Sequence, residues 1–470
     1  MTSNAPRRAV LTAALAAAAA TATAQTASAA QAPASAPSDR SAPAAAHGGA
    51  GAASADAAPV EYHAWTSYVD WLFGEHKGTI PVPGVRPGVA IARATGTFDY
   101  TDPHTGTTAT WECATWTSPV HHIAHPSSEL VSSWNAHTPA GTWIQVELLG
   151  TYTDGTATPA FIMGRWTAGD GDEDIRRTSV DDQTDGTSSI YTDTFAVDDT
   201  TAGKLLASYR LRVTLFRKPG SKATPTVWRL GAFASDIPDR FTVPTSTPGL
   251  SGAVELPVPA YSQDIHKGQY PQYDNGGEAW CSPTSSTMVI EYWGRGPTAA
   301  DMAWIDPTYA DPQVDQGARC TYDYQYEGCG NWPFNAAYAA TYKDLQGVVT
   351  QLHSLNDIER LVKAGIPVVT SQSFLASELD GAGYSTSGHL MCIIGFTAEG
   401  DVVANDPASI DDAAVRNIYK RGQFETVWLR TKRITASGHV GSGSGGVAYL
   451  YFPAHPSPGQ RRALASVGVV

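Results

Sequence analysis

The order of apolar and polar positions changes near residue 250. Between residues 60 and 245 the two kinds of position alternate with a period of two, and the apolar ones are rich in β-branched and aromatic residues. Such runs, bounded by Gly, Asp and Pro, are typical of β-strands. Six strands are predicted: TTATWECATWTS (107–118), TWIQVELLGTYT (142–153), PAFIMGRWT (159–167), SIYTDTFAV (189–197), YRLRVTLFR (209–217) and TVWRLGAFA (226–234).

The regular spacing of these short strands favours an all-β sandwich or jelly roll for residues 60–245. An earlier segment, HAWTSYVDWLF (63–73), is more helical or typical of a sheet edge. A chain of 470 residues exceeds what one hydrophobic core usually supports. We therefore expect this front domain to be followed by a second domain.

Helices and strands alternate in the back half. ELPVPAYSQ (255–263) is predicted to be a short strand, and residues 281–293 a helix, since Pro283 suits a first turn and four apolar residues share one face. A helix followed by a core strand is expected at 354–374. Two apolar runs around TAEGD predict a β-hairpin that ends at Asp406. The four apolar helix residues are Met288, Val289, Tyr292 and Trp293.

The first 59 residues have a different composition. Arg7 and Arg8 precede an alanine-rich run, and residues 1–30 together have the composition of an export signal. Both the twin-arginine and the ordinary secretory route remain open. Residues 31–59 are rich in Ala, Pro and Ser and are predicted to be a disordered linker. We therefore expect a secreted protein.

Two classes of partner are disfavoured. No later run approaches the length of a membrane span, so no stable membrane anchor is expected. The formal net charge of −14 disfavours nucleic acid as a partner. Otherwise the charge mainly indicates solubility.

Five cysteines are present, and outside the cell they are expected to pair where they can. Cys320 and Cys329 bracket the loop CTYDYQYEGC, which predicts a disulfide between them. Cys392 lies in an apolar run and is expected to be a buried strand sulfur. The odd count leaves at least one free thiol, and the state of Cys113 stays open.

Cys281 is the candidate nucleophile, because it stands at the start of the predicted helix. Unpaired N–H groups and the positive end of the helix dipole stabilise a thiolate there. A nucleophilic thiol also needs a base and a group that orients the base. The predicted hairpin brings the start of its first strand, His389, beside the end of its second, Asp406. Alone, His389 is explained by packing in the core and Asp406 by a turn. Together with Cys281 they predict a catalytic triad.

These segments resemble a known family of cysteine peptidases. VPAYSQ, WCSPTSSTMVIEYWG and GHLMCIIGFTAEGDVVANDPA are similar to the bacteriocin-processing type, family 39 of the cysteine peptidases, in its stand-alone secreted actinobacterial form. The resemblance spans roughly residues 255–455 and implies a papain-like α+β fold. It also implies that Cys281 is the nucleophile, His389 the base and then acid, Asp406 the orienting group, and Gln263 an oxyanion donor beside the Cys281 N–H.

One departure from the family leaves an alternative open. Gln263 precedes Cys281 by a wider interval than in the processing peptidases, so Asn275 is a competing oxyanion donor. The expected reaction is hydrolysis of peptide or related amide bonds through a thioester, with no cofactor and no metal. The alternatives are a secreted glycan- or cell-surface-binding protein with a silent back domain, and a cell-wall amide hydrolase or transpeptidase. Candidates for substrate contacts are Tyr322, Tyr324, Tyr326 and Trp332.

Three features of the front domain are candidates for binding. The cluster HHIAH lacks an acidic or thiol partner at metal-ligand spacing, so its histidines are expected in a surface loop. An acidic run lacks the glycine of a calcium loop and is expected to be solvated. Tryptophans could stack on sugar rings, although most are expected in a sandwich core. These residues are His121, His122 and His125; Asp170, Asp172, Asp174, Asp181 and Asp182; and Trp111, Trp116, Trp134, Trp143 and Trp166.

Overall fold

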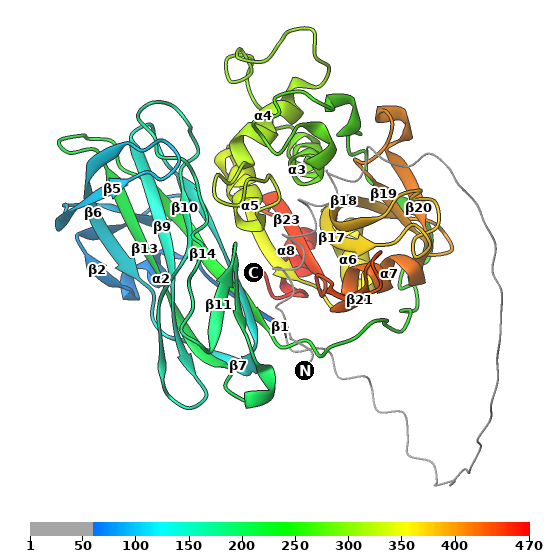
Figure 1. Ribbon diagram of the computed structural model, residues 1–470, viewed down its shortest axis with the longest axis horizontal. Helices are drawn as coiled ribbons and strands as arrows, with labels where there is room; N and C mark the ends of the chain where they lie inside the picture. Colours follow the sequence, from blue (N-terminus) through cyan, green and yellow to red (C-terminus); the bar gives the residue numbers. More distant parts are fainter. Residues whose placement is uncertain (1–59) are drawn as a thin grey trace.

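The computed structural model describes residues 60–470, which form a strand-rich front domain and a mixed α/β back domain (Figure 1). The predicted export signal (1–30) and linker (31–59) lie outside the described residues. The prediction of two domains of different class is confirmed. Within residues 60–470, no helix combines the length and the apolar character needed to cross a bilayer.

The front domain contains two seven-stranded antiparallel sheets. The order of the first is β11 (Ser188–Tyr191), β12 (Thr194–Val197), β8 (Glu129–His137), β14 (Thr226–Ser235), β4 (Gly88–Ile91) and β3 (Thr79–Val82), with β1 (Val60–Trp65) on β14. The order of the second is β10 (Ala157–Trp166), β9 (Thr142–Tyr152), β13 (Leu206–Arg217), β6 (Thr108–Thr117) and β2 (Glu75–Lys77), with β5 (Gly96–Thr101) on β6 and β7 (His121–Ser127) on β13.

Alternation along the strands builds the front core. Ile144, Val146 and Leu148 of β9 are fully buried in the same apolar cluster as Leu230 of the other sheet. Five of the six predicted strands correspond to single strands. The sixth, SIYTDTFAV, is a hairpin of β11 and β12, because Thr192 turns the chain with a φ of 59°. Segment 63–73 divides into the end of β1 and the helix α2 (Tyr68–Phe73).

The back domain is built on a third seven-stranded antiparallel sheet. Its order is β16 (Leu345–Gln351), β23 (Val447–Pro453), β17 (Val368–Phe374), β18 (Thr386–Phe396), β19 (Val402–Asn405) and β20 (Arg416–Tyr419), with β15 (Val254–Glu255) on β18. A small hairpin, β21 (Lys432–Ile434) with β22 (Val440–Ser442), lies apart. The helices are α3 (Cys281–Tyr292), α4 (Pro312–Thr321), α5 (Trp332–Thr341), α6 (Leu355–Lys363), α7 (Arg421–Leu429) and α8 (Pro458–Ala465).

Helices cover both faces of this sheet. Leu390 and Cys392 of β18 belong to the cluster that contains α3 and α5, whereas Met391 and Ile393 belong to the cluster of α6, α7 and α8. Burial on both faces explains why the strand is a continuous apolar run. The predicted hairpin of β18 and β19 and the helix-then-strand step of α6 and β17 are confirmed. The predicted strand 255–263 is wrong, since only its first residue belongs to β15.

Helix α5 lies between the two domains and packs against β16 on one side and β8 on the other (Figure 1). A Cβ at Gly347 of β16 would lie 2.0 Å from the Ala336 carbonyl oxygen, so only glycine permits this approach. The Asn135 amide of β8 donates to the Gly347 carbonyl at 2.7 Å and accepts its N–H at 3.3 Å. A buried apolar cluster runs across this junction.

Candidate active site

Cys281 is the first residue of α3, where the sequence predicts it, and its side chain is buried with 8% of its surface exposed. Trp280, which precedes it, is fully buried and donates its indole N–H to the Tyr273 carbonyl at 2.6 Å. This bond fixes the chain as it enters the helix. The N–H groups of the first turn have no partner inside the helix and remain available to an anion.

Hydroxyl groups attach α3 to the sheet. Ser285 donates to the Leu390 carbonyl of β18 at 3.1 Å, directly beside His389. Ser282 and Ser286 share hydrogen bonds with Tyr449 and Tyr451 of β23, 3.0 and 2.9 Å long. The helix is therefore buried on all sides over residues 281–290, not only along the predicted apolar face. These bonds set the position of the thiol relative to the histidine strand.

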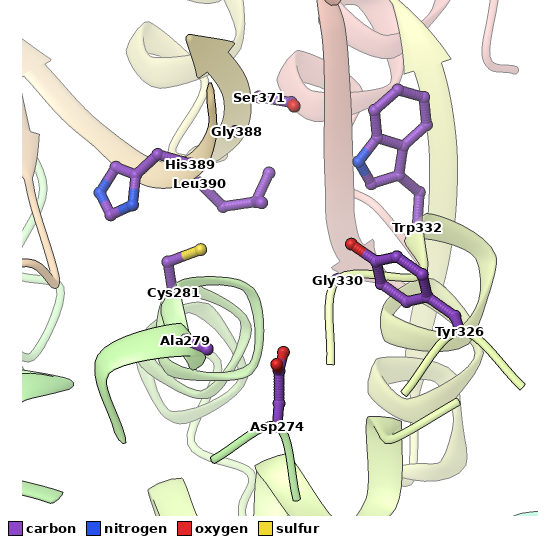
Figure 2. Close-up of a pocket in the computed structure, with 10 residues that line it drawn as sticks. All are labelled: Asp274, Ala279, Cys281, Tyr326, Gly330, Trp332, Ser371, Gly388, His389 and Leu390. Atoms are coloured by element: carbon purple, nitrogen blue, oxygen red, sulfur yellow. The ribbon is translucent and has the colours of Figure 1, made fainter. Parts of the chain in front are cut away.

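His389 and Asp406 meet as the hairpin register requires. Cys392 pairs with Asn405, so the residues beyond them approach each other, and His389 Nε2 lies 2.8 Å from Asp406 Oδ1. Both side chains are almost completely buried, with 4% and 1% of their surface exposed. The other ring nitrogen, Nδ1, is left for the Cys281 sulfur, which rises from α3 toward the strand that carries His389 (Figure 2).

The protonation of this pair follows from opposing effects. Burial lowers the pKa of His389, but the Asp406 carboxylate and the Cys281 sulfur raise it more strongly, to about 10. Burial raises the pKa of Asp406, but His389 and three other hydrogen-bond donors hold it below its usual value. At neutral pH the structure thus favours an imidazolium beside an ionised carboxylate.

Two tyrosines that the sequence analysis missed surround this carboxylate. Tyr384 donates to Asp406 at 2.9 Å, and Tyr419 donates to it at 2.6 Å. The Tyr384 ring also meets the His389 ring edge-on, with centroids 5.5 Å apart. Tyr419 reaches Asp406 because β20 pairs with β19. No spacing in the sequence marks either residue, since Tyr384 lies in the bend before β18 and Tyr419 depends on the pairing of β20 with β19.

Cys281 and His389 line one pocket with residues from three other segments (Figure 2). The pocket holds about 440 Å³ of empty space, part of it open to solvent. The catalytic wall is formed by Cys281 with β18, and the opposite wall by Asp274 and the segment before α5. The full lining is Asp274, Ala279, Cys281, Tyr326, Gly330, Trp332, Ser371, Gly388, His389 and Leu390.

The two candidate oxyanion donors lie outside this lining. Gln263 is buried, and its side-chain N–H donates to the Glu278 carbonyl at 2.6 Å, while its backbone N–H donates to the Pro407 carbonyl. It therefore lies between the Asp406 loop and the approach to α3. Asn275 is exposed, and its neighbour Asp274 lines the pocket instead. The role of each stays a prediction.

The predicted disulfide is not formed, since Cys320 and Cys329 are both free. Cys320 lies on α4, where its sulfur accepts a hydrogen bond from Gln316 one turn earlier. The Cys329 sulfur faces the Ala318 carbonyl at 3.5 Å. The loop is short enough to be bridged, but the helix directs one sulfur away. Burial raises the thiol pKa of Cys113, Cys320, Cys329 and Cys392.

The front domain supports the wall opposite the cysteine. Asp193, in the turn between β11 and β12, accepts the Trp332 N–H at 2.8 Å. The Ser179 N–H donates to Asp323 at 2.9 Å, and Asp323 also accepts the Tyr326 N–H. Tyr326 and Trp332 are thus the two predicted substrate-contact residues that line the pocket. Tyr322 and Tyr324 lie outside its lining.

The acidic run of the front domain was predicted to be solvated, but only part of it is. Asp170 forms a bidentate ion pair with Arg319 of α4, with both distances 2.7 Å. Asp181 accepts a hydrogen bond from Gln325 at 2.8 Å. Asp174 accepts backbone N–H groups of its own domain, while Asp172 and Asp182 are exposed. Part of the run therefore forms the domain interface.

The other two front-domain features are the histidine cluster and the tryptophans, and only the histidine cluster differs from expectation. The HHIAH histidines lie on strand β7, not in a loop, and His121 lies 2.6 Å from the Glu61 carboxylate. Among residues 60–470, no group of three or more His, Cys, Asp or Glu is arranged to hold a metal ion. The tryptophans that could have stacked on sugars offer no exposed face, because all five are buried: Trp111, Trp116, Trp134, Trp143 and Trp166.

Comparison with known families gives the same division of the chain. A profile described as the peptidase C39 N-terminal domain matches residues 61–235, and one described as the Peptidase_C39 like family matches residues 255–436. The chain is a member of the C39-like peptidases. The family resemblance of the catalytic segments is thereby confirmed, and the front domain of this C39-like peptidase matches a domain associated with the same group.

Among solved structures, this C39-like peptidase is similar to a crystal structure from Bacillus anthracis that is provisionally assigned as a C39-like peptidase. The two share 18% identity, and the match covers 43% of this chain and 97% of the other, with a TM-score of 0.26. A score this low carries no argument about function. No curated protein matches this C39-like peptidase in sequence.

Proposed function

We propose that this chain is a cysteine peptidase that hydrolyses peptide or related amide bonds through Cys281, His389 and Asp406. The observation that carries the proposal is a buried His389–Asp406 pair, 2.8 Å apart, whose histidine lines a pocket together with a cysteine at a helix N-terminus. Membership of the C39-like peptidases supports it. The arrangement of a helix-borne thiol against a strand-borne imidazole also favours a papain-like fold for residues 255–455.

In the proposed reaction, the Cys281 thiolate attacks the carbonyl carbon of the scissile bond while His389 is protonated. The negative oxygen of the tetrahedral intermediate is stabilised by the Cys281 N–H, and Gln263 is the predicted second donor. Collapse breaks the C–N bond, and the imidazolium gives its proton to the leaving amine. Neutral His389 then takes a proton from water, whose oxygen attacks the thioester and restores the thiolate.

Asp406 acts through His389 and does not touch the substrate. Its carboxylate fixes the ring so that Nδ1 is directed to the sulfur, and its charge favours the imidazolium. Tyr384 and Tyr419 hold the carboxylate itself. Because Asp406 accepts several hydrogen bonds, it stays ionised and keeps one orientation throughout the cycle. These two tyrosines are therefore positioning residues in the proposed mechanism.

The first test is substitution of the nucleophile. Cys281→Ala should reduce hydrolysis of fluorescein-labelled casein to the uncatalysed level while thermal unfolding stays close to that of the wild type. Cys392→Ala is the matched control, since it removes another buried thiol from the same cluster but not the proposed nucleophile. Full hydrolysis by Cys281→Ala would end the proposal.

The reaction class also needs a test of its own, because the same thiol chemistry serves a cell-wall amide hydrolase or a transpeptidase. Purified peptidoglycan and labelled casein should be incubated separately, and new amine and carboxyl ends counted. Peptide ends from casein alone would support the peptidase. Ends from peptidoglycan alone would favour the cell-wall amide hydrolase.

The third alternative, a glycan-binding protein with a silent back domain, would show no enhanced thiol reactivity at Cys281. We further propose action outside the cell, on the basis of the export signal predicted at residues 1–30.

A further inference from the structure

An acidic side chain faces the thiol across the pocket. Asp274 precedes α3 in the chain, and Figure 2 shows its carboxylate pointing into the space between Cys281 and Tyr326. One of its oxygens accepts the Cys329 N–H at 3.1 Å, which anchors the side chain to the wall segment. The other carboxylate oxygen of Asp274 takes no part in that hydrogen bond. A carboxylate is thus presented to whatever lies beside the reacting sulfur.

No cation neutralises this carboxylate among its interactions in the described chain. Burial raises the pKa of Asp274 to about 7, and the Cys329 N–H is the one group that lowers it. Two nearby titratable groups, Tyr322 and Cys329, bring no positive charge. Elsewhere in the chain a mostly buried acid such as Asp170 is paired with an arginine. Asp274 therefore has no positively charged partner among the described residues. A positively charged ligand would supply one.

The rest of the wall suits the same kind of ligand. Tyr326 and Trp332 line the pocket beside Asp274. Aromatic rings attract ammonium and guanidinium groups through their faces and pack against the apolar stem that carries them. Fixed acid and aromatic groups together form a site for a long side chain with a cationic end.

The backbone at Asp274 is also held in an uncommon conformation. Asp274 and Asn275 have φ values of 57° and 61°, in the left-handed region that most residues avoid. Asn tolerates this region as well as Asp does, so Asp274→Asn changes the charge with little change in backbone preference.

We propose that Asp274 determines specificity by binding a positively charged side chain, of the lysine or arginine type, next to the bond that is cleaved. The proposal rests on the proposed function of Cys281 and adds the substrate class. The substrate is a basic peptide segment whose ammonium or guanidinium group pairs with the Asp274 carboxylate while its alkyl stem lies against Tyr326 and Trp332.

The test uses peptidyl chloromethyl ketones that alkylate a cysteine in the pocket. Two pairs are compared, with lysine or norleucine at the first or at the second residue from the reactive group and glycine at the other position. Norleucine keeps the alkyl stem and lacks the ammonium group. The rate constant of Cys281 modification is measured by mass spectrometry of the full-length protein. In the wild type, one lysine probe should react about 10- to 100-fold faster than its norleucine partner.

Asp274→Asn should abolish that preference while the rate with the norleucine probe changes less than about twofold. Asp182→Asn is the matched control, because Asp182 has nearly the same φ, 58°, and is exposed on the front domain. This control should keep the full preference for lysine. A preference that survives in Asp274→Asn, or a wild type that treats both probes of each pair alike, would overturn the inference.

Iodoacetamide separates this inference from the proposed function, since it has no side chain to recognise. Fast alkylation of Cys281 by iodoacetamide without any preference for lysine would overturn the role of Asp274 and leave the peptidase proposal standing. Slow reaction of Cys281 with every reagent would contradict both the role of Asp274 and the peptidase proposal.

Discussion

The two walls of the pocket are built in different ways. The catalytic wall belongs to the back domain alone, where Ser285 joins the cysteine helix to the strand that carries His389. The opposite wall consists of Asp274 and the segment that leads from α4 into α5, and the front domain holds this segment through Asp193 and Ser179. In the proposed function, the first wall supplies the chemistry and the second supplies the shape that a substrate meets. The front domain is therefore expected to affect substrate binding more than bond breaking.

The largest effect is expected on the catalytic wall. Asp406→Asn removes the charge that raises the pKa of His389, so burial should dominate and the pKa should fall from about 10 toward or below the ordinary value. The imidazolium is then lost at lower pH. Casein hydrolysis should decrease on the order of 100-fold, and the alkaline limb of its pH profile should move toward neutral pH.

Asp401→Asn is the control for that variant, since Asp401 lies at the turn of the same hairpin and pairs with Lys420. It should leave both the rate and the pH profile unchanged. An alkaline limb that stays in place in Asp406→Asn would show that the carboxylate does not set the charge of His389.

A smaller effect is expected on the opposite wall. Asp193→Ala removes the acceptor of the Trp332 N–H, a bond to a charged group whose loss costs about 1.5–3 kcal/mol. Casein hydrolysis should then show a KM raised about tenfold with kcat changed less than about threefold. The alkylation rate of Cys281 by iodoacetamide should be unchanged, because the catalytic wall is intact.

Asp198→Ala provides the comparison for the second wall. Asp198 accepts hydrogen bonds from Ser189 and Tyr191 within the front domain. Loss of the Asp198 carboxylate should destabilise the hairpin of β11 and β12, which also carries Asp193, without changing the KM for casein. If Asp193→Ala slowed the alkylation of Cys281 by iodoacetamide as much as the hydrolysis of casein, the proposed separation of roles between the two walls would be wrong.

The sequence analysis predicted best what depends on local pattern. Alternation identified most strands of the front domain. The run from His389 to Asp406 predicted the hairpin of β18 and β19, although β18 begins at Thr386 and β19 ends at Asn405. SIYTDTFAV was taken as one strand because its turn, at Thr192 and Asp193, carries no Gly or Pro and the single Asp was not read as a turn. The predicted Cys320–Cys329 disulfide failed because α4 extends to Thr321 and turns Cys320 toward Gln316.

Contacts between distant segments could not be predicted from the sequence. Tyr419 reaches Asp406 only through the pairing of β20 with β19, and Asp193 reaches Trp332 only through the packing of two domains. The place of Asp274 in the pocket could not be predicted either, because it follows from the fold of the loop. The residues that complete the site are therefore those whose neighbours are far away in the chain.

The most direct test of the central claim is the alkylation rate of Cys281 by iodoacetamide as a function of pH, in the wild type and in His389→Ala. The account predicts that between about pH 6 and pH 8 Cys281 of the wild type is alkylated on the order of 10-fold faster than Cys281 of His389→Ala, because only the wild type holds an imidazolium beside the sulfur. Equal rates for the two proteins across this range would contradict the account.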